Sequence, residues 1–413
     1  MKFDTIIIGG GLSGLACGIS LAEQGKRCAI VSSGQGALHF SSGSIDLLGY
    51  EGEKEVKSPL DALASLDANH PYSLVGTENV KAISGDALAF FERVGVTFVG
   101  SNAENHYRLT PVGNLRPTWI TLGEYFTAND IDSFKGKKVM LLNVAGYLDM
   151  PVKFIASGLE KLGVNCDVAE FSVPELEKRR ENASEMRSVN IAKVVETIGI
   201  EKIAEIINEK AKNYDILLAP AVFGWNGNGQ VEKLQQLTAG KVKLVATLPP
   251  SVPGVRLQTL MRKYFQSLGG TILLGDTVES GAIENGKLQW VKTHNLEDEK
   301  LIAENYVLAT GNFFSHGLAG APNEVYEPIF GLDVVAKNDR GEWYNEQFFE
   351  EQPYMRFGVA TDTTFKAKKD GKAIENLYVA GSVLSGANQV KEASMGGVSL
   401  ITGLYVAKLI NKK

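Results

Sequence analysis

A glycine-rich turn near the start of the chain is the feature that most constrains the fold. The stretch IIIGGGLSGLACG (6–18) places Gly9, Gly11 and Gly14 in the pattern G-x-G-x-x-G. Gly9 permits a tight turn after a strand, Gly11 lets a phosphate approach the backbone, and Gly14 lets a helix pack closely on the sheet. The pattern therefore predicts a strand–turn–helix unit whose helix start binds a nucleotide phosphate.

The surroundings of the turn support this interpretation. An apolar strand is expected over 4–8, a helix over 12–24 and a second apolar strand over 28–31, which together form a βαβ unit. The alternative is a glycine-rich turn that binds nothing. Ser32 follows the second strand, where a dinucleotide site usually has an acidic residue that binds the ribose of adenosine. Serine makes only a neutral hydrogen bond, and no arginine follows for a 2′-phosphate, so NAD(P) is disfavoured.

Composition limits the classes of protein. The chain has 413 residues, which suggests two domains, and 44% of them are hydrophobic. Its net charge is −6, so it lacks the excess of basic residues that nucleic-acid binding favours.

The three cysteines, Cys17, Cys28 and Cys166, are far apart. We expect no metal site or iron–sulfur cluster in this chain, and a reducing cytosol fits. The opening residues do not resemble a signal peptide, and no apolar run is long enough for a transmembrane segment.

Three later features favour a flavin. One strand ends in ATG (309–311), another ends in AGS (380–382), and a C-terminal helix opens on Gly396 and Gly397. Together they resemble flavoproteins of the two-dinucleotide-binding-domain type, in which the chain returns to its N-terminal cofactor. A helix start near flavin N1 and O2 would stabilise the negative charge of the reduced ring. The alternative is a helix that begins with glycine only for packing.

The expected fold is therefore α/β, a Rossmann-like flavoprotein fold of the FAD/NAD(P)-binding type with a second, inserted α/β domain. The flavin domain is expected over 1–50, 241–320 and 361–413. The inserted substrate or partner domain is expected over 51–240 and 321–360.

Several stretches across the whole chain resemble the B subunit of the bacterial anaerobic glycerol-3-phosphate dehydrogenase. They are GQGALHFSSGSIDLL (34–48), HPYSL (70–74), LPPSVPGVRLQ (248–258), EPIFGLDV (327–334), GEWY (341–344) and FGVATDTTF (357–365). The resemblance implies a flavin-dependent, quinone-linked oxidoreductase subunit that takes part in oxidising sn-glycerol 3-phosphate to dihydroxyacetone phosphate. In anaerobic respiration the electrons would pass to fumarate or nitrate.

The same resemblance implies cofactor and partners. FMN is the implied cofactor, with FAD as the alternative. An FAD-bearing A subunit and an iron–sulfur C subunit would be the partners, and the C subunit would tether this cytoplasmic chain to the inner membrane. FMN would explain Ser32, because it has no adenosine ribose. Ser382 also favours FMN over FAD, because related FAD proteins usually have an acidic residue at this position.

Candidate site residues follow from position and chemistry. A base must take the hydroxyl proton and a cation must hold the phosphate. His39 and His316 are candidates for the base, and Arg256 for the cation, each against the alternative of a structural role. Arg116 and Arg187 are weaker candidates for the cation. The predicted cofactor-binding residues are Gly9, Gly11, Gly14, Ser32, Ser41, Ser42, Gly311, Gly381, Ser382, Gly396 and Gly397.

Three functional hypotheses remain open at this stage. The chain could be an FMN-bearing redox subunit that works with an FAD-bearing partner, or a flavin enzyme that oxidises its substrate alone. The third hypothesis is a structural subunit, poor in cofactor, that only docks its partners. Ser32 and Ser382 favour the third, whereas the intact glycine turn opposes it.

Overall fold

The computed structural model describes residues 1–128, 132, 135–227 and 229–412. The chain forms two compact units. Unit 1 comprises Met1–Ala37, Asp46–Ala87 and Met261–Lys413, and unit 2 comprises Leu38–Ile45 and Leu88–Leu260.

This division differs from the expected one at four places. Residues 51–87 and 321–360 belong to unit 1, whereas 38–45 and 241–260 belong to unit 2. Packing explains two of these differences. The short helices at 71–75 and 77–85 pack against the C-terminal helix of unit 1. The strand at 242–245 pairs with a strand of the unit 2 sheet.

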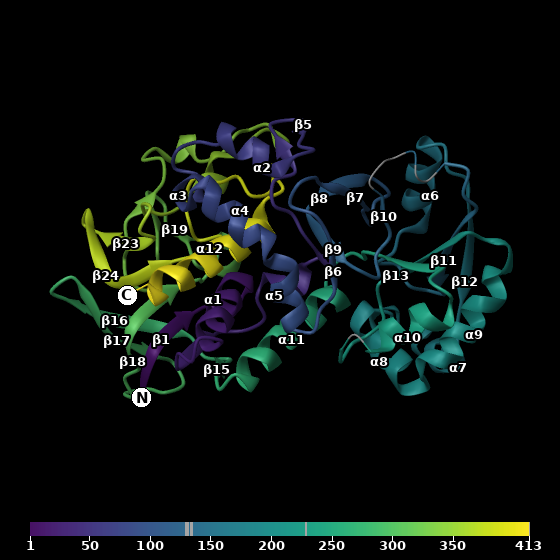
Figure 1. Ribbon diagram of the computed structural model, residues 1–413, viewed down its shortest axis with the longest axis horizontal. Helices are drawn as coiled ribbons and strands as arrows, with labels where there is room; N and C mark the ends of the chain where they lie inside the picture. Colours follow the sequence, from purple (N-terminus) through teal and green to yellow (C-terminus); the bar gives the residue numbers. More distant parts are fainter. Residues whose placement is uncertain (129–131, 133–134, 228, 413) are drawn as a thin grey trace. The chain divides into compact units, whose positions relative to one another are not determined.

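A mostly parallel six-stranded sheet forms the centre of unit 1 (Figure 1). Its first five strands run parallel and the last runs antiparallel. The central strands are buried apolar runs, which suits a parallel sheet covered on both faces. In spatial order the strands are β15 (Thr271–Leu274), β2 (Cys28–Ser32), β1 (Lys2–Ile8), β18 (Ile302–Leu308), β24 (Lys372–Val379) and β23 (Lys366–Lys369).

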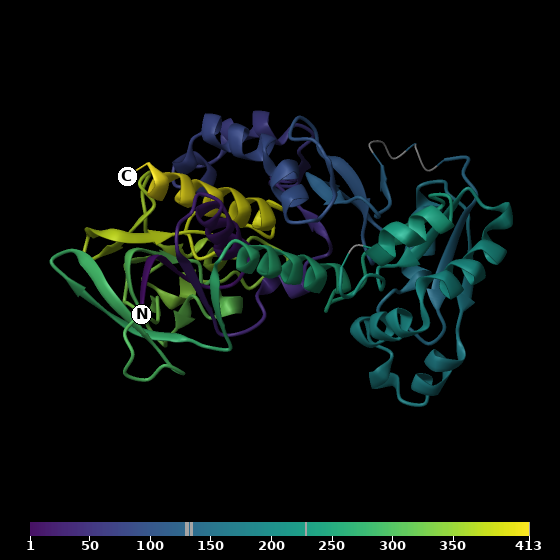
Figure 2. The same cartoon turned by 60° about the horizontal axis from the view of Figure 1, so that its bottom comes forward.

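Two helices of unit 1 lie side by side in both views (Figure 1, Figure 2). They are α1 (Leu12–Ala22) and α12 (Met395–Asn411). Glycine allows their close approach, because a Cβ on Gly403 would lie 2.5 Å from the carbonyl oxygen of Ser13. The other helices of unit 1 are α2 (Pro59–Ala62), α3 (Pro71–Val75), α4 (Thr77–Gly85) and the C-terminal part of α11 (Val252–Ser267).

Short antiparallel pairs complete unit 1. They are β16 (Val278–Glu284) with β17 (Lys287–Thr293), β4 (Tyr50–Glu51) with β5 (Lys54–Glu55), β19 (Ala319–Gly320) with β20 (Val325–Tyr326), and β21 (Val334–Val335) with β22 (Gly358–Val359).

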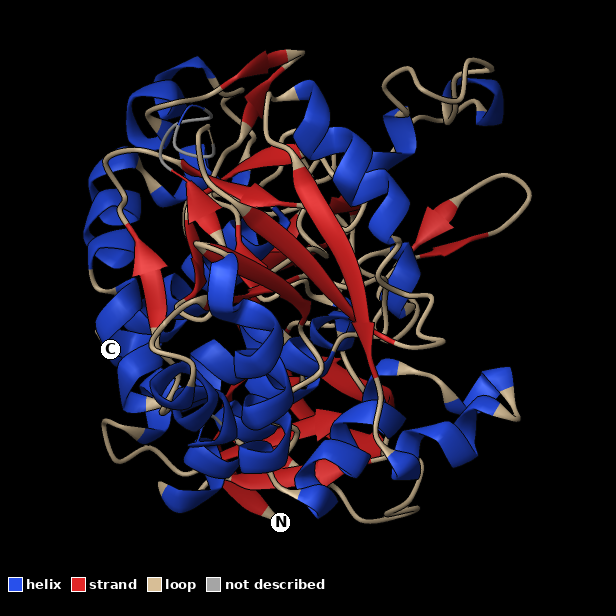
Figure 3. Cartoon of the chain, turned by 90° about the vertical axis from the view of Figure 1, so that its right-hand side faces the viewer, coloured by secondary structure: helices blue, strands red, loops and turns tan. Residues whose placement is uncertain are grey.

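Unit 2 is also α/β, as the strands and helices of Figure 3 show. Its parallel sheet has the order β12 (Cys166–Phe171), β11 (Val139–Val144), β13 (Ile216–Pro220) and β14 (Val242–Val245). The unit also contains α5 (Ala87–Arg93) beyond its first residue, α6 (Val152–Lys161), α7 (Pro174–Arg180), α8 (Ser188–Ile198), α9 (Ile200–Lys210) and α10 (Gly229–Leu237).

Two three-stranded sheets accompany this core. One has the order β3 (Ser44–Ile45), β9 (Ile120–Leu122), β6 (Phe98–Gly100), and the other β10 (Thr127–Ala128), β7 (His106–Leu109), β8 (Leu115–Thr118). Within the described part of the chain, no helix combines the length and apolar character needed to cross a bilayer. The described residues also include no group of three or more His, Cys, Asp or Glu side chains that could hold a metal ion.

Candidate functional site

The glycine turn lies between β1 and α1, at the carboxyl end of the parallel sheet. Gly9 has φ = +120°, a conformation that favours glycine, and a Cβ there would lie 2.1 Å from the carbonyl oxygen of Ala309. A Cβ on Gly14 would lie 1.9 Å from the carbonyl oxygen of Gly9. Both glycines are therefore required by backbone packing, whether or not a ligand is bound.

Gly11 differs from its neighbours because nothing in the protein requires a glycine there. Its φ is −80°, and a Cβ at this position would meet no atom within 4 Å. Gly11 is the N-cap of α1, no side chain caps the helix, and the first turn carries no acidic residue. A helix start with no side-chain cap, no acidic residue and open space beside its N-cap is an arrangement that can accept an anion.

The ends of the neighbouring strands meet beside this turn. Gly381, after β24, approaches α1 so closely that a Cβ there would lie 2.4 Å from Ser13 Oγ. Gly311, after β18, has φ = +82°, and its Cβ position lies 3.6 Å from Ser382 Oγ. The structure thus brings Gly311, Gly381 and Ser382 to the same edge of the sheet as the glycine turn. This is the edge at which parallel α/β sheets bind ligands.

Several buried polar atoms in unit 1 have no hydrogen-bond partner among the described residues, and two of them belong to segments that bear on the site. These two are Thr310 Oγ1, directly after β18, and Gln389 Oε1, in the loop before α12. An unpaired buried polar atom is costly, so a bound ligand is one explanation for each. Together with the space over Gly11, these atoms show that unit 1 fits a polar nucleotide cofactor.

The start of α12 is fixed by a backbone hydrogen bond of Gly397 and by close packing around this residue. Gly397 donates its N–H to the carbonyl oxygen of Asp46 at 2.9 Å. A Cβ on Gly397 would lie 2.3 Å from Tyr72 Oη, which itself donates to the carbonyl oxygen of Leu47 at 2.8 Å. The N–H of Gly397 is therefore already hydrogen-bonded within the protein. Of the two glycines that open the helix, Gly396 is the one whose N–H could face a cofactor.

A buried ionic network fixes the loop before α12. His70 is 1% exposed; its Nδ1 accepts the N–H of Tyr72, and its Nε2 lies 3.2 Å from Glu392 Oε2. Arg356 Nη1 lies 3.3 Å from Glu392 Oε1. Burial by itself would raise the pKa of Glu392, but the hydrogen bond and charge of His70, the Asn388 N–H and the charge of Arg356 lower it. Glu392 is thus a stable anion directly before the helix.

His70 stands before Pro71, a context that by itself predicts only a turn residue. In the structure it caps α3 and joins two segments that are 322 residues apart. Periodicity and spacing do not reveal such a long-range pair.

The end of β2 holds a positive charge, that of Arg262, so the expectation that no arginine is present there for a 2′-phosphate is wrong. Ser32 is buried, and its Oγ donates to the carbonyl oxygen of Gly34 at 3.0 Å. Arg262, from α11, donates to the same oxygen at 3.2 Å and to Gln35 Oε1 at 3.0 Å. Burial lowers the pKa of Arg262, although a guanidinium stays protonated at neutral pH.

His39, Ser41, Ser42 and Arg256 belong to unit 2. Ser41 Oγ accepts the N–H of Gly43 at 3.3 Å, and Ser42 Oγ lies 3.0 Å from Ser44 Oγ, so both serines take part in a local turn. His39 is half-buried, and its carbonyl accepts the N–H of Ser251.

Arg256 forms a buried ion pair. It is 1% exposed, pairs with Glu124 and donates to the carbonyl oxygen of Phe223 at 3.2 Å. It lies in the second turn of α11, not at the helix start that the sequence indicated. These contacts describe a structural arginine, and the described geometry adds no support for a role in binding substrate phosphate.

His316 is exposed and belongs to unit 1. It follows a short 3-10 helix, Phe313–Ser315, and has φ = +60° in the left-handed region. Its position after β18 puts it on the loop that leaves the carboxyl edge of the sheet. The imidazole is accessible to a ligand there, and its role as a base remains a prediction.

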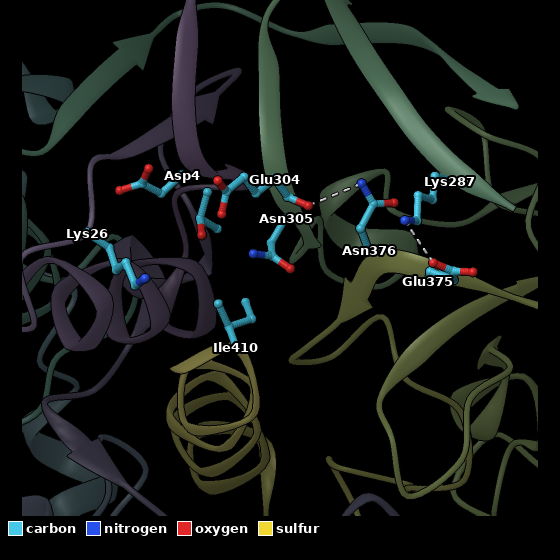
Figure 4. Close-up of a pocket in the computed structure, with 9 residues that line it drawn as sticks. Asp4, Lys26, Lys287, Glu304, Asn305, Glu375, Asn376 and Ile410 are labelled. Atoms are coloured by element: carbon cyan, nitrogen blue, oxygen red, sulfur yellow. Dashed lines mark hydrogen bonds and ion pairs between the residues drawn. The ribbon is translucent and has the colours of Figure 1, made fainter. Parts of the chain in front are cut away.

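A cavity of about 390 Å³ opens at the opposite end of the unit 1 sheet (Figure 4). Its lining is of mixed charge: Lys287 pairs with Glu375 at 3.1 Å, and Asn376 donates to the carbonyl oxygen of Glu304 at 3.2 Å. Asp4, near the start of β1, also lines it. Because ligands of parallel sheets bind at the carboxyl ends of the strands, this cavity is not the nucleotide site.

Comparisons with known proteins bear on the fold and on the class of cofactor. The family model described as "FAD binding domain" matches residues 4–400. It confirms a flavoprotein fold and supports a flavin cofactor.

Two solved structures cover the whole chain at low similarity. They are 3-ketosteroid delta1-dehydrogenase from Sterolibacterium denitrificans, 11% identical with a TM-score of 0.47 over 100% of both chains, and Escherichia coli quinol fumarate reductase, 9% identical with a TM-score of 0.46 over 100% of this chain and 70% of the other.

Curated relatives match over their full length, and each is named as the B subunit of an anaerobic glycerol-3-phosphate dehydrogenase. The relative from Yersinia enterocolitica is 41% identical, over 99% of this chain and 98% of the relative, and that from Pectobacterium atrosepticum is 38% identical, over 100% and 99%. The expected resemblance is therefore confirmed. With a flavoprotein domain along nearly its whole length and relatives of this identity, the chain belongs to the family formed by the B subunits of anaerobic glycerol-3-phosphate dehydrogenases.

Proposed function

We propose that this chain is the flavin-bearing B subunit of a complex that oxidises sn-glycerol 3-phosphate to dihydroxyacetone phosphate. The electrons would pass through partner subunits to the quinone pool, with fumarate or nitrate as the final acceptor. The observation that carries the proposal is the open space over Gly11, between two glycines that backbone packing requires. A fold that had lost its cofactor would have no need to keep Gly11 small.

FMN is the cofactor we propose, with FAD as the alternative that the name of the family model favours. Gly9, Gly11 and Gly14 would hold the phosphate at the start of α1. The neutral Ser32 and Ser382 replace the acidic residues that an FAD site usually places at the ends of these two strands. Thr310 and Gln389 supply buried polar atoms that a flavin could pair.

The reaction divides between the cofactor and the protein. A bound flavin supplies the acceptor for the hydride on the carbon that bears the substrate hydroxyl. The protein must remove the hydroxyl proton, and His316 in unit 1 and His39 in unit 2 are the proposed bases. Gly396, at the start of α12, would place an N–H and the positive end of the helix dipole near the flavin ring. Glu392 and His70 would fix the loop that positions this helix.

Partner subunits are part of the proposal: an FAD-bearing A subunit and an iron–sulfur C subunit that holds the complex on the inner membrane. An aromatic segment of unit 1 supports docking. Phe348 and Phe349 are 83% and 85% exposed, with their rings 5.3 Å apart, and the exposed Glu346 and Glu350 flank them. Exposed aromatic pairs are unusual on a free surface. Such a segment fits a partner surface that is apolar with a basic rim.

One alternative remains, a cofactor-poor structural or relay subunit that docks an FAD-bearing catalytic partner. The two hypotheses differ in what the isolated chain does. Purified chain would be mixed anaerobically with glycerol 3-phosphate and its visible spectrum recorded, with and without the partner subunits.

The redox-subunit proposal predicts a flavin spectrum that bleaches when substrate and partners are both present. Bleaching without partners would identify a dehydrogenase that works alone. A colourless chain that takes up no added flavin would overturn the proposal in favour of the structural subunit.

A further inference from the structure

The carboxyl end of β2 carries a positive charge, whereas a site for an adenine dinucleotide usually carries a negative charge there. A dinucleotide site places a carboxylate there to accept hydrogen bonds from the ribose of adenosine. This chain has the neutral Ser32 at that point and brings the guanidinium of Arg262 beside it. We propose that Arg262 binds the terminal phosphate of the flavin mononucleotide and so makes the site selective for FMN over FAD. This inference rests on the proposed flavin site of unit 1.

Three contacts in series connect Arg262 with the phosphate turn. A Cβ on Gly10 would lie 2.5 Å from Ser32 Oγ, so the end of β2 directly adjoins the turn. Ser32 Oγ and Arg262 Nη2 both donate to the carbonyl oxygen of Gly34, at 3.0 and 3.2 Å. This shared acceptor links the guanidinium to the residue that lies against the turn. All these residues belong to unit 1.

None of the contacts described for Arg262 supplies a negative charge to balance its guanidinium. Its acceptors are the Gly34 carbonyl and the Gln35 side-chain amide, both neutral. A carboxylate of the same sheet edge is Asp276, after β15, whose N–H donates to the carbonyl oxygen of Ser32 at 3.3 Å. Asp276 Oδ1 accepts the N–H groups of Thr277 and Asn295 at 2.8 and 2.9 Å, so it serves the backbone of that turn. A half-buried guanidinium with neutral partners favours an anionic ligand.

The charge of FMN suits this arrangement better than that of FAD. A terminal phosphate has a second pKa of about 6 and carries almost two negative charges at neutral pH. Each phosphate within a dinucleotide bridge carries less charge, and the adenosine half would meet Arg262 in place of a carboxylate. Arginine can bind a terminal phosphate with two parallel hydrogen bonds. The same substitution therefore favours the mononucleotide and disfavours the dinucleotide.

The test uses full-length chain from which flavin has been removed. Riboflavin, FMN and FAD are titrated into the wild type and into Arg262→Gln, and binding is followed by flavin fluorescence. We expect wild type to bind FMN at least about tenfold more tightly than riboflavin or FAD. Arg262→Gln should lose about tenfold or more in FMN affinity and leave riboflavin affinity unchanged.

Arg27→Gln is the matched control, because Arg27 is exposed and lies at the other end of β2. Thermal unfolding of each apoprotein checks that the variants fold. A second measurement repeats the FMN titration at pH 7 and pH 5. Wild-type affinity should fall as the phosphate gains a proton, and the Arg262→Gln variant should show a smaller fall.

The outcomes separate this inference from the proposed function. Unchanged FMN affinity in folded Arg262→Gln overturns the role of Arg262 but leaves the flavin site intact. Equal or tighter binding of FAD by the wild type overturns the selectivity. If the wild type binds none of the three flavins, the proposed function fails and this inference fails with it.

Discussion

A Cβ on Gly14 would lie 1.9 Å from the carbonyl oxygen of Gly9, whereas a Cβ on Gly11 would meet no atom within 4 Å. One motif thus contains two kinds of glycine. The close contact between Gly9 and Gly14 lets the helix pack on the strand. Replacing either glycine by alanine should prevent proper folding, because the added Cβ has no room. At Gly11 no described atom of the protein excludes a Cβ, so a bound phosphate is the reason we propose for the small residue at this position.

Gly11→Ala should therefore separate cofactor binding from folding. The backbone at Gly11 has φ = −80°, which alanine adopts without strain. We expect an unfolding free energy within about 1 kcal/mol of wild type, because alanine is a poorer N-cap than glycine but leaves the chain less flexible when unfolded, together with a loss of most of the bound flavin. Gly320→Ala is the control, because its Cβ would also be in open space but far along the chain from the turn. Full flavin content in Gly11→Ala would show that no phosphate lies over the turn.

Glu392 should make stability depend on pH in the acid range. Its folded pKa is below the ordinary value of 4.5, so the stabilisation of the carboxylate by its hydrogen bond with His70 and by the charge of Arg356 is fully present above that pH. As the pH falls below 4.5 towards the folded pKa, the unfolded chain binds the proton first and stability is lost. Glu392→Gln should lower stability at pH 7 and flatten this part of the profile.

Urea unfolding between pH 3 and pH 7 measures the effect. Glu375→Gln is the control, because the ion pair between Glu375 and Lys287 is exposed. Parallel profiles for wild type and Glu392→Gln below pH 4.5 would contradict the assigned role of Glu392.

His106 should produce a second pH dependence, at higher pH. Burial and then the nearby charge of Arg108 lower the pKa of His106 from 6.5 to about 4. The unfolded chain takes up a proton near pH 6.5, and the folded chain does so only near pH 4. The contribution of neutral His106 to the free energy of unfolding is therefore fully present above pH 6.5. It falls by about 2–4 kcal/mol as the pH drops to 4.

His106→Gln should remove most of this slope, although it also changes the contact with Thr121 at 2.8 Å. His294→Gln provides the comparison, because His294 is exposed. Calorimetry of unfolding at several pH values between 4 and 7 would show the difference. A slope that persists in His106→Gln would assign it to other groups.

The aromatic segment of unit 1 can be tested by assembly. Replacing both Phe348 and Phe349 by serine should weaken binding to the partner subunits at least about tenfold, because exposed aromatic side chains often dominate an interface. Flavin content and unfolding temperature should not change. Size-exclusion chromatography of the mixed subunits measures assembly, with Phe314→Ser, another exposed aromatic residue of unit 1, as the comparison. Full assembly of the double variant would exclude this segment from the interface.

Local patterns predicted the framework of unit 1 well. The expected strand over 4–8, helix over 12–24 and strand over 28–31 correspond to β1, α1 and β2, with shifts of two residues at most. The C-terminal helix was likewise placed within a residue of α12. These elements follow from short apolar runs, helical periodicity and glycine positions, which the sequence states directly.

Contacts between distant segments could not be predicted in this way. Arg262 reaches Gly34 across 228 residues, and Arg256 pairs with Glu124 across 132. Both arginines lie on one helix, yet one faces the end of β2 and the other forms a buried ion pair. Which role each takes depends on the packing of α11, and no local pattern encodes that. The sequence selected Arg256 because of the loop before it and passed over Arg262.

Identification of the cofactor in the purified chain tests the central claim most directly. The chain would be prepared without partner subunits, its visible spectrum recorded, and its cofactor released with acid and identified by mass. The account predicts FMN, held by the glycine turn with Ser32 facing no ribose. FAD would contradict the assignment of the β2 end, and a colourless chain that takes up neither flavin would contradict the flavin site itself.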